Sequence, residues 1–102
     1  MRKTHALIGV AAALLAEPEA RHWGYDLGRR SGVRSGVLYP MLARMLREGW
    51  LTDGWEDPAT LTERRPPRRY YELTEHGKLE LAATVRAARA DHRFAALDLG
   101  WA

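Results

Sequence analysis

The sequence predicts a single, mainly α-helical domain with one small β-hairpin. The chain has 102 residues, a length that seldom divides into two domains. Apolar residues recur at helical spacing in four segments, while one aromatic segment alternates as a strand does. Hydrophobic residues make up 46% of the chain and charged residues 28%, so there is enough apolar surface to build a core.

The first helix is predicted close to the N-terminus. Thr4 can cap it, its apolar residues continue to Leu15, and Pro18 ends it. Two basic residues precede this apolar run, as in a signal peptide, but the run is too short to span a membrane and no cleavage site follows it. We therefore expect a soluble, cytoplasmic protein without a membrane partner.

A second, short helix is predicted from residue 19 to residue 30. Trp23 and Leu27 share its apolar face, and His22 lies on the opposite side with the arginines of the segment. Gly32 can close the helix, because glycine readily adopts the left-handed conformation that ends many helices.

The third helix is predicted to start at Ser35 as its N-cap and to carry an apolar stripe. The residues of the stripe are Leu38, Leu42, Met45 and Gly49, joined by Met41 and Leu46. The outer face consists of Ser35, Tyr39, Pro40, Ala43, Arg44 and Arg47. Because a proline beyond the first turn removes a backbone hydrogen bond, we expect an irregular helix around Pro40.

A β-hairpin is predicted from residues 50–55 and 69–73, where aromatic residues are frequent and the pattern alternates. The stretch 56–68 between these strands contains three prolines and no period, which indicates a long loop. We interpret Trp50 and Trp55, together with Trp23, as core and hairpin-base aromatics.

The last helix is predicted after Thr74, its N-cap, and extends for about twenty residues. Its apolar positions at helical spacing are Leu81, Val85, Ala88, His92, Ala95 and Leu99. We divide the chain into residues 1–73 and a C-terminal helix, residues 74–102, within one compact unit.

Three helices followed by a two-stranded hairpin and a further helix are the element order of a winged helix-turn-helix. In this fold the third helix enters the major groove and the hairpin approaches the adjacent minor groove or backbone. The positive charge is concentrated in the segment that contains the second and third helices. Residues 21–50 hold six arginines against Asp26 and Glu48, a sum of +4, whereas the whole chain has a net charge of +3. A basic face of this kind favours DNA as the partner.

Four blocks of the sequence resemble the PadR family of regulators. They are Gly24-Tyr25-Asp26-Leu27, the run 35–46 with Leu38-Tyr39-Pro40 at its centre, Glu48-Gly49-Trp50-Leu51, and the run 69–77. The match extends over about residues 5–80 and departs from the commoner pattern at Val37, where threonine is frequent. The single C-terminal helix is similar to that of the smaller subfamily.

The resemblance implies a homodimeric repressor that binds double-stranded DNA. Some residues are expected at the DNA because of the family pattern, and others because they are basic and point outwards. These residues are Arg34, Ser35, Gly36, Tyr39, Arg44, Arg47, Arg64, Arg65 and Arg68. Phosphate contacts position such a protein and base contacts give it specificity, and arginine can do both. A two-fold dimer would read a pseudo-palindromic operator.

The dimer is expected to form through the C-terminal helix, with help from the first helix. The candidate dimer or effector residues are Leu81, Val85, Ala88, His92, Phe94, Leu99 and Trp101. A small aromatic effector between the dimer helices is a further candidate partner, because some relatives of this family bind flat aromatic ligands there.

Other functions find little support in the sequence. There is no cysteine, the four histidines have no metal-site spacing, and no catalytic group of residues can be assembled. We therefore expect neither an enzyme nor a metal or cofactor site. Two alternatives stay open: a winged-helix module that binds a protein rather than DNA, and a DNA-binding protein of another winged-helix family.

Overall fold

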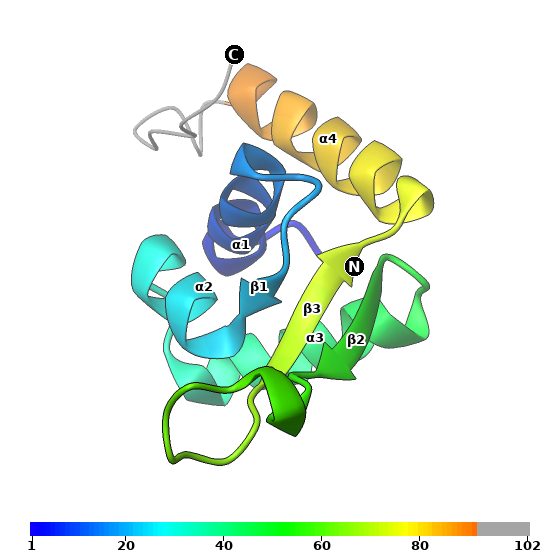
Figure 1. Cartoon of the computed structure of the whole chain (residues 1–102). Coiled ribbons are helices and arrows are strands. Elements are labelled where there is room, and N and C mark those ends of the chain that lie inside the picture. Colours follow the sequence, from blue (N-terminus) through cyan, green and yellow to red (C-terminus); the bar gives the residue numbers. More distant parts are fainter. Residues whose placement is uncertain (92–102) are drawn as a thin grey trace.

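The computed structural model describes residues 1–91 as four α-helices and a small antiparallel sheet (Figure 1). The order of elements confirms the predicted fold class, with one strand more than the two expected. The elements are α1 (His5–Ala16), β1 (His22–Trp23), α2 (Gly24–Ser31), α3 (Ser35–Arg47), β2 (Leu51–Trp55), a 3-10 turn (Pro58–Thr60), β3 (Arg69–Leu73) and α4 (Glu75–Ala90).

The core lies between α1 and the three other helices, with the sheet along one side. Helices α1 and α4 lie side by side at one end of the molecule, and α3 lies towards the other end, next to β2 (Figure 1). The α1 residues Leu7, Ile8, Val10 and Leu14 are almost completely buried. Thr4 caps this helix as predicted, since its hydroxyl accepts a hydrogen bond of 3.1 Å from the Leu7 amide. None of the helices within residues 1–91 has the length and apolar character needed to cross a bilayer.

The second helix starts later than the predicted residue 19. Residues 22 and 23 form the short strand β1, and α2 begins only at Gly24. The strands are ordered β1-β3-β2, with His22 opposite Tyr71. His22 is therefore buried rather than turned outwards, and its Nε2 lies 2.9 Å from the Glu17 carbonyl oxygen. Desolvation by burial lowers the pKa of His22, so the neutral ring is favoured.

Helix α3 begins at Ser35, within the expected range, but its N-cap is not the predicted residue. Arg34 occupies the N-cap position without a side-chain hydrogen bond, and Ser35 is the first helical residue, so the prediction of Ser35 as the cap is wrong. Helix α3 accommodates Pro40 in its interior. The helix ends in a Schellman motif, because Gly49 has a φ of 75° and the Trp50 amide donates to the Met45 carbonyl at 2.9 Å. Gly49 thus lies beyond the helix and is not part of its apolar stripe.

Helix α4 packs its apolar face against α1 within the same chain. Leu81, Val85 and Ala88 are completely buried there. The expectation that these three residues form the dimer surface is therefore wrong, because no exposed area is left on them for a partner. The helix ends at Ala90 after 16 residues, against the twenty predicted. The other candidates, His92, Phe94, Leu99 and Trp101, lie outside the described residues.

The beginning of α4 is fixed to the end of α3 and the start of β2. The Thr74 hydroxyl caps α4 by accepting from the Gly77 amide at 2.9 Å, and it donates to the Gly49 carbonyl at 2.6 Å. Gly77 is buried against the backbone of Trp50, a tryptophan that is 8% exposed, as a core residue should be. Trp55 differs from the prediction: it is 66% exposed near the end of the hairpin.

Candidate nucleic-acid interface

Helices α2 and α3 form a helix-turn-helix whose turn is defined by local backbone geometry. Gly32 has a φ of 72°, and its amide donates to the Gly28 carbonyl at 2.9 Å, which ends α2 as predicted. The Ser31 hydroxyl accepts from the Val33 amide at 3.2 Å and so supports the turn. As a result, α3 presents one buried face, with Leu38, Leu42 and Met45, and one solvent-exposed face.

The exposed face of α3 carries the predicted residues. Ser35, Gly36, Tyr39, Arg44 and Arg47 are all exposed, as is Arg34 just before the helix. Within residues 1–91, the side chains of Arg34 and Arg47 make no hydrogen bond or ion pair. The Arg44 Nε lies 3.9 Å from a Glu48 oxygen, with both side chains about half exposed, and such surface pairs are weak. Three guanidinium groups can therefore reach a partner at little cost.

Tyr39 lies against the start of α2, and glycine at position 24 makes this contact possible. A Cβ built on Gly24 would be only 2.5 Å from the Tyr39 hydroxyl oxygen. Tyr39 is nevertheless 46% exposed, so the side chain stays accessible at the surface. This arrangement is suited to a phosphate contact, a role that tyrosine hydroxyls commonly fill at DNA.

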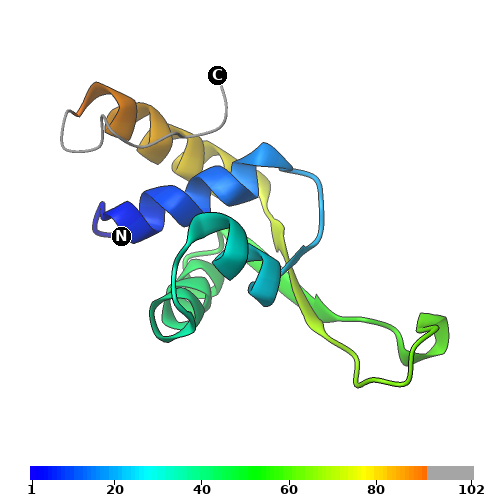
Figure 2. The same ribbon diagram turned by 90° about the vertical axis from the view of Figure 1, so that its left-hand side faces the viewer.

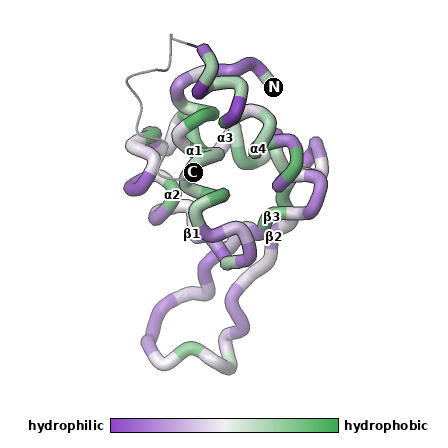
Figure 3. Tube along the Cα trace, turned by 90° about the horizontal axis from the view of Figure 1, so that it is seen from above, coloured by the Kyte–Doolittle hydropathy of each residue, from purple (hydrophilic) through white to green (hydrophobic). Residues whose placement is uncertain are grey.

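The hairpin β2–β3 and the loop 56–68 form a wing that projects from the domain (Figure 2). The observed β3 has the predicted bounds, and β2 begins one residue later than predicted. Seen from above, the projecting loop is mainly hydrophilic, whereas the hydrophobic segments lie in the helical body (Figure 3). The wing is thus a polar arm on a compact helical support.

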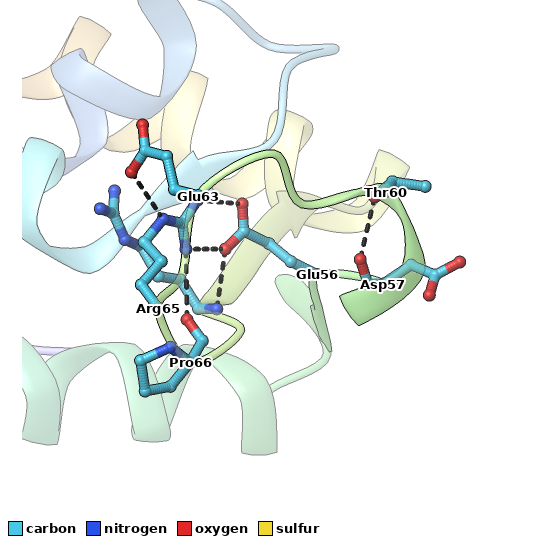
Figure 4. A network of polar contacts seen from close by, with 7 residues as sticks. Glu56, Asp57, Thr60, Glu63, Arg65 and Pro66 are labelled. Carbon is cyan, nitrogen blue, oxygen red and sulfur yellow. Dashed lines mark hydrogen bonds and ion pairs between the residues drawn. The ribbon is translucent and has the colours of Figure 1, made fainter.

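An ion-pair network closes the wing loop (Figure 4). The two terminal nitrogens of Arg65 donate to the two carboxylate oxygens of Glu56 at 2.6 and 3.1 Å. The Arg68 amide donates to Glu56 at 2.8 Å, and the Arg65 Nε lies 3.4 Å from Glu63. These hydrogen bonds lower the pKa of Glu56 to about 2, and the bond from Arg65 has the largest effect. The carboxylate therefore stays charged at neutral pH.

The four wing arginines consequently have different environments. Arg65 is engaged inside the loop, with 24% of its side chain exposed, which disfavours its predicted contact with DNA. Arg69 donates from Nε to Asp53 across the hairpin at 2.8 Å. Arg64 and Arg68 are exposed, and neither side chain makes a hydrogen bond or close ion pair within the described chain, although the charge of Arg68 acts on the nearby Glu56 carboxylate. These two are the wing residues available to an anionic partner.

Sequence reasoning missed Glu56 and Asp53, the acidic residues that fix two of the wing arginines. A signal existed for Asp53, because it lies on one hairpin strand and Arg69 on the other. Glu56 and Arg65 are separated by an irregular loop, and no periodic pattern relates them.

The described residues contain no group of three or more acidic or histidine side chains arranged to hold a metal ion. The chemistry that residues 1–91 offer on this side of the molecule is cationic and hydrogen-bonding: exposed arginines, a tyrosine hydroxyl and a serine. Together with the fold, it defines a winged helix-turn-helix protein of the DNA-binding class.

Comparison with known proteins identifies the family. The model of the transcriptional regulator PadR-like family matches residues 19–83, more than half of the chain, and the chain belongs to this family. It is a transcriptional regulator and not an enzyme. No curated protein is similar enough in sequence to count as a match.

Three solved structures show the same fold. A PadR family transcription regulator from Clostridium difficile R20291 is 18% identical, with a TM-score of 0.66 over 85% of this chain and 91% of the other. A protein from Streptococcus mutans UA159 is 21% identical, with a TM-score of 0.66 over 88% of this chain and 83% of the other. The PcaV transcriptional regulator from Streptomyces coelicolor is 27% identical, with a TM-score of 0.66 over 95% of this chain and 67% of the other.

Proposed function

We propose that the protein is a cytoplasmic, homodimeric repressor that binds a pseudo-palindromic operator through α3 and the wing. One observation carries this proposal: the exposed face of α3 offers Tyr39 and unpaired arginines, and the wing adds Arg64 and Arg68. An interaction module for proteins would instead present an apolar face at this position. Release by a small effector is part of the proposal.

The proposal is tested by fluorescence anisotropy of the purified protein with two duplexes: the DNA upstream of its own gene and a scrambled sequence of equal composition. Both are measured at low and at physiological salt, because phosphate contacts make DNA affinity fall with salt. Binding that prefers the upstream duplex and weakens with salt is the expected result. Equal, weak binding of both duplexes at every salt concentration would favour the protein-interaction module.

Arg44 is expected to contribute to sequence preference. Its guanidinium is exposed on the outer face of α3 and only weakly held by Glu48. Substitution Arg44→Ala should cost about 1–3 kcal/mol on the specific duplex if the side chain reads a guanine, and less on the scrambled one. The Glu48→Gln variant is the matched control, because it frees Arg44 without removing it. An equal loss on both duplexes for Arg44→Ala would show that Arg44 contacts phosphate only.

The homodimer is proposed to form through the exposed face of α4, since the inner face is covered by α1. Leu79 is 71% exposed, and Ala83, Ala87 and Ala90 follow it at helical spacing on the same side. An exposed leucine followed by small residues allows two helices to approach closely. Helix α1 then supports α4 from within the protomer and does not contribute to the contact.

Substitution Leu79→Glu is expected to convert the dimer to a monomer at micromolar concentration, because it places a charge in an apolar contact. Sedimentation velocity measures the change. The control is Glu80→Lys, which alters charge on the flank of the same helix and should leave the dimer intact. Dimerisation of Leu79→Glu with unchanged strength would exclude this face of α4.

A further inference from the structure

Val37 is an apolar residue exposed on the helix that is proposed to enter the major groove. It lies in the first turn of α3, where its amide donates to the Arg34 carbonyl at 3.0 Å, and it is 46% exposed. The buried face of the helix is formed by Leu38, Leu42 and Met45, and Val37 does not belong to it. None of the DNA contacts proposed above involves Val37.

The surroundings of Val37 are those of a DNA surface. Pro40 is exposed three residues further along, which makes it a neighbour of Val37 on the helix surface. Arg44 is exposed four residues after Pro40, and Arg34 is exposed just before the helix. Exposed arginines thus flank the apolar position at both ends, and such groups attract the phosphates of DNA.

The chemistry of Val37 limits what it can recognise on DNA. Neither Val37 nor Pro40 has a side-chain donor or acceptor, so these residues cannot read a base by hydrogen bonds. Among the groups that the standard base pairs present in the major groove, the 5-methyl group of thymine is the apolar one. 5-Methylcytosine carries a methyl group at the same ring position. Val37 therefore matches the 5-methyl group of a pyrimidine.

The position and stiffness of Val37 suit such a contact. In helix-turn-helix proteins the N-terminal residues of the recognition helix contact the base edges. The adjacent Gly36 has no side chain, and none of the described atoms lies within 4 Å of a Cβ built on it, so this turn is open to a partner. A β-branched side chain has one strongly preferred χ1 rotamer in a helix, so ordering Val37 against a methyl group costs little entropy.

A protein partner is the other occupant that an exposed valine could have. Each side of a standard protein interface buries about 800 Å², of which Val37 and Pro40 can supply only a small part. The flanking arginines would have to be buried together with them. A valine between exposed arginines is better matched to DNA, because the arginines can neutralise phosphates while the valine meets a base.

We propose that Val37 contacts the 5-methyl group of a thymine in each half-site of the operator and so determines the base at that position. The inference rests on the proposed function, since it requires that α3 enters the major groove. Loss of the methyl group should weaken binding about fourfold per half-site, which corresponds to about 0.8 kcal/mol for one buried CH₂-sized group.

The test starts from the duplex that the full chain enriches most strongly from randomised DNA. Each thymine of this duplex is replaced in turn by uracil, which lacks only the 5-methyl group, and the affinity is measured by anisotropy. We expect a symmetry-related position in the two half-sites where uracil weakens binding. The expected loss is about fourfold for one half-site and about fifteenfold for both.

5-Methylcytosine separates the two sources of a methyl group. At the sensitive position the T·A pair is replaced by a C·G pair, with and without a 5-methyl group on the cytosine. Tighter binding of the methylated pair would show that the methyl group itself is recognised on either pyrimidine. No gain from methylation, with the loss caused by uracil intact, would assign the contact to thymine alone.

Three variants assign the contact to Val37. Val37→Ala removes both γ-methyl groups at a half-exposed position, so the fold should be kept while uracil no longer weakens binding. Val37→Thr keeps one γ-methyl group and should keep most of the discrimination, because a threonine methyl can also contact thymine. Arg47→Gln is the control on the same helix: it should weaken binding of both duplexes equally and leave the fourfold ratio unchanged.

Two results would overturn the proposal and leave the proposed function standing. One is an enriched duplex in which no uracil weakens binding. The other is an equal loss with uracil in the unmodified protein and in Val37→Ala, which would assign the thymine contact to another residue. If the selection enriched no sequence at all, the proposed function would be contradicted, and the thymine contact with it.

Discussion

Replacing Gly77 with alanine is expected to lower the free energy of unfolding by about 3 kcal/mol, the upper range for overpacking of a core. A Cβ at this position would lie 2.0 Å from the Trp50 carbonyl oxygen and 2.7 Å from its carbonyl carbon. Both are backbone atoms, so a side-chain rotation cannot relieve the contact. Helix α4 would have to move away from the start of β2, and the Thr74 cap that joins the two would be strained.

The measurement is urea unfolding followed by circular dichroism, with Gly36→Ala as the matched control. Gly36 is also helical, but nothing lies within 4 Å of a Cβ built there, so alanine should raise stability by up to about 1 kcal/mol. The same control bears on function: if the first turn of α3 approaches DNA closely, Gly36→Ala is more stable yet binds DNA more weakly. Equal stability of the two variants would contradict the close packing of α4 on Trp50.

The elements that the sequence predicts best are those with local signals. Thr4, Gly32 and Thr74 mark helix ends by cap chemistry, and each of them caps the helix for which it was predicted. The strand β3 was found at its full length because its aromatic residues alternate. A strand of two residues such as β1 is too short to show a period, and its extended backbone depends on pairing with β3.

The predictions that were wrong concern residues whose environment depends on partners distant in the sequence. The stripe Leu81, Val85 and Ala88 correctly predicted a buried face, but a periodic pattern does not say whether the face is buried by its own chain or by a second one. In the structure α1 covers it. Arg64 and Arg65 are likewise indistinguishable as neighbouring arginines, and only the position of Glu56 separates their roles.

Because Arg65 is held by Glu56 whereas Arg64 and Arg68 are exposed, the wing arginines are expected to differ in their effect on DNA binding. The double variant Arg64→Gln/Arg68→Gln should reduce the steepness of the plot of log K against log salt by about 2. Each phosphate contact on duplex DNA contributes about 0.9 to this slope, and the variant removes two such contacts. The loss should be equal on specific and scrambled duplexes, because phosphate contacts carry no sequence information. Anisotropy titrations at several salt concentrations measure the slope.

The same substitution at the neighbouring arginine, Arg65→Gln, should have a different effect. Its guanidinium donates to both Glu56 oxygens, so the expected consequence is loss of order in the loop, visible as faster hydrogen exchange of amides in 57–67. Glu56→Gln should reproduce this exchange pattern, because it weakens the same pair from the other side and also weakens the hydrogen bond from the Arg68 amide. In the double variant the exchange should stay slow, since the pair remains. If Arg65→Gln lowered the salt slope and left exchange unchanged, Arg65 would contact the phosphates itself, and the wing would be held in shape by something other than its ion pair with Glu56.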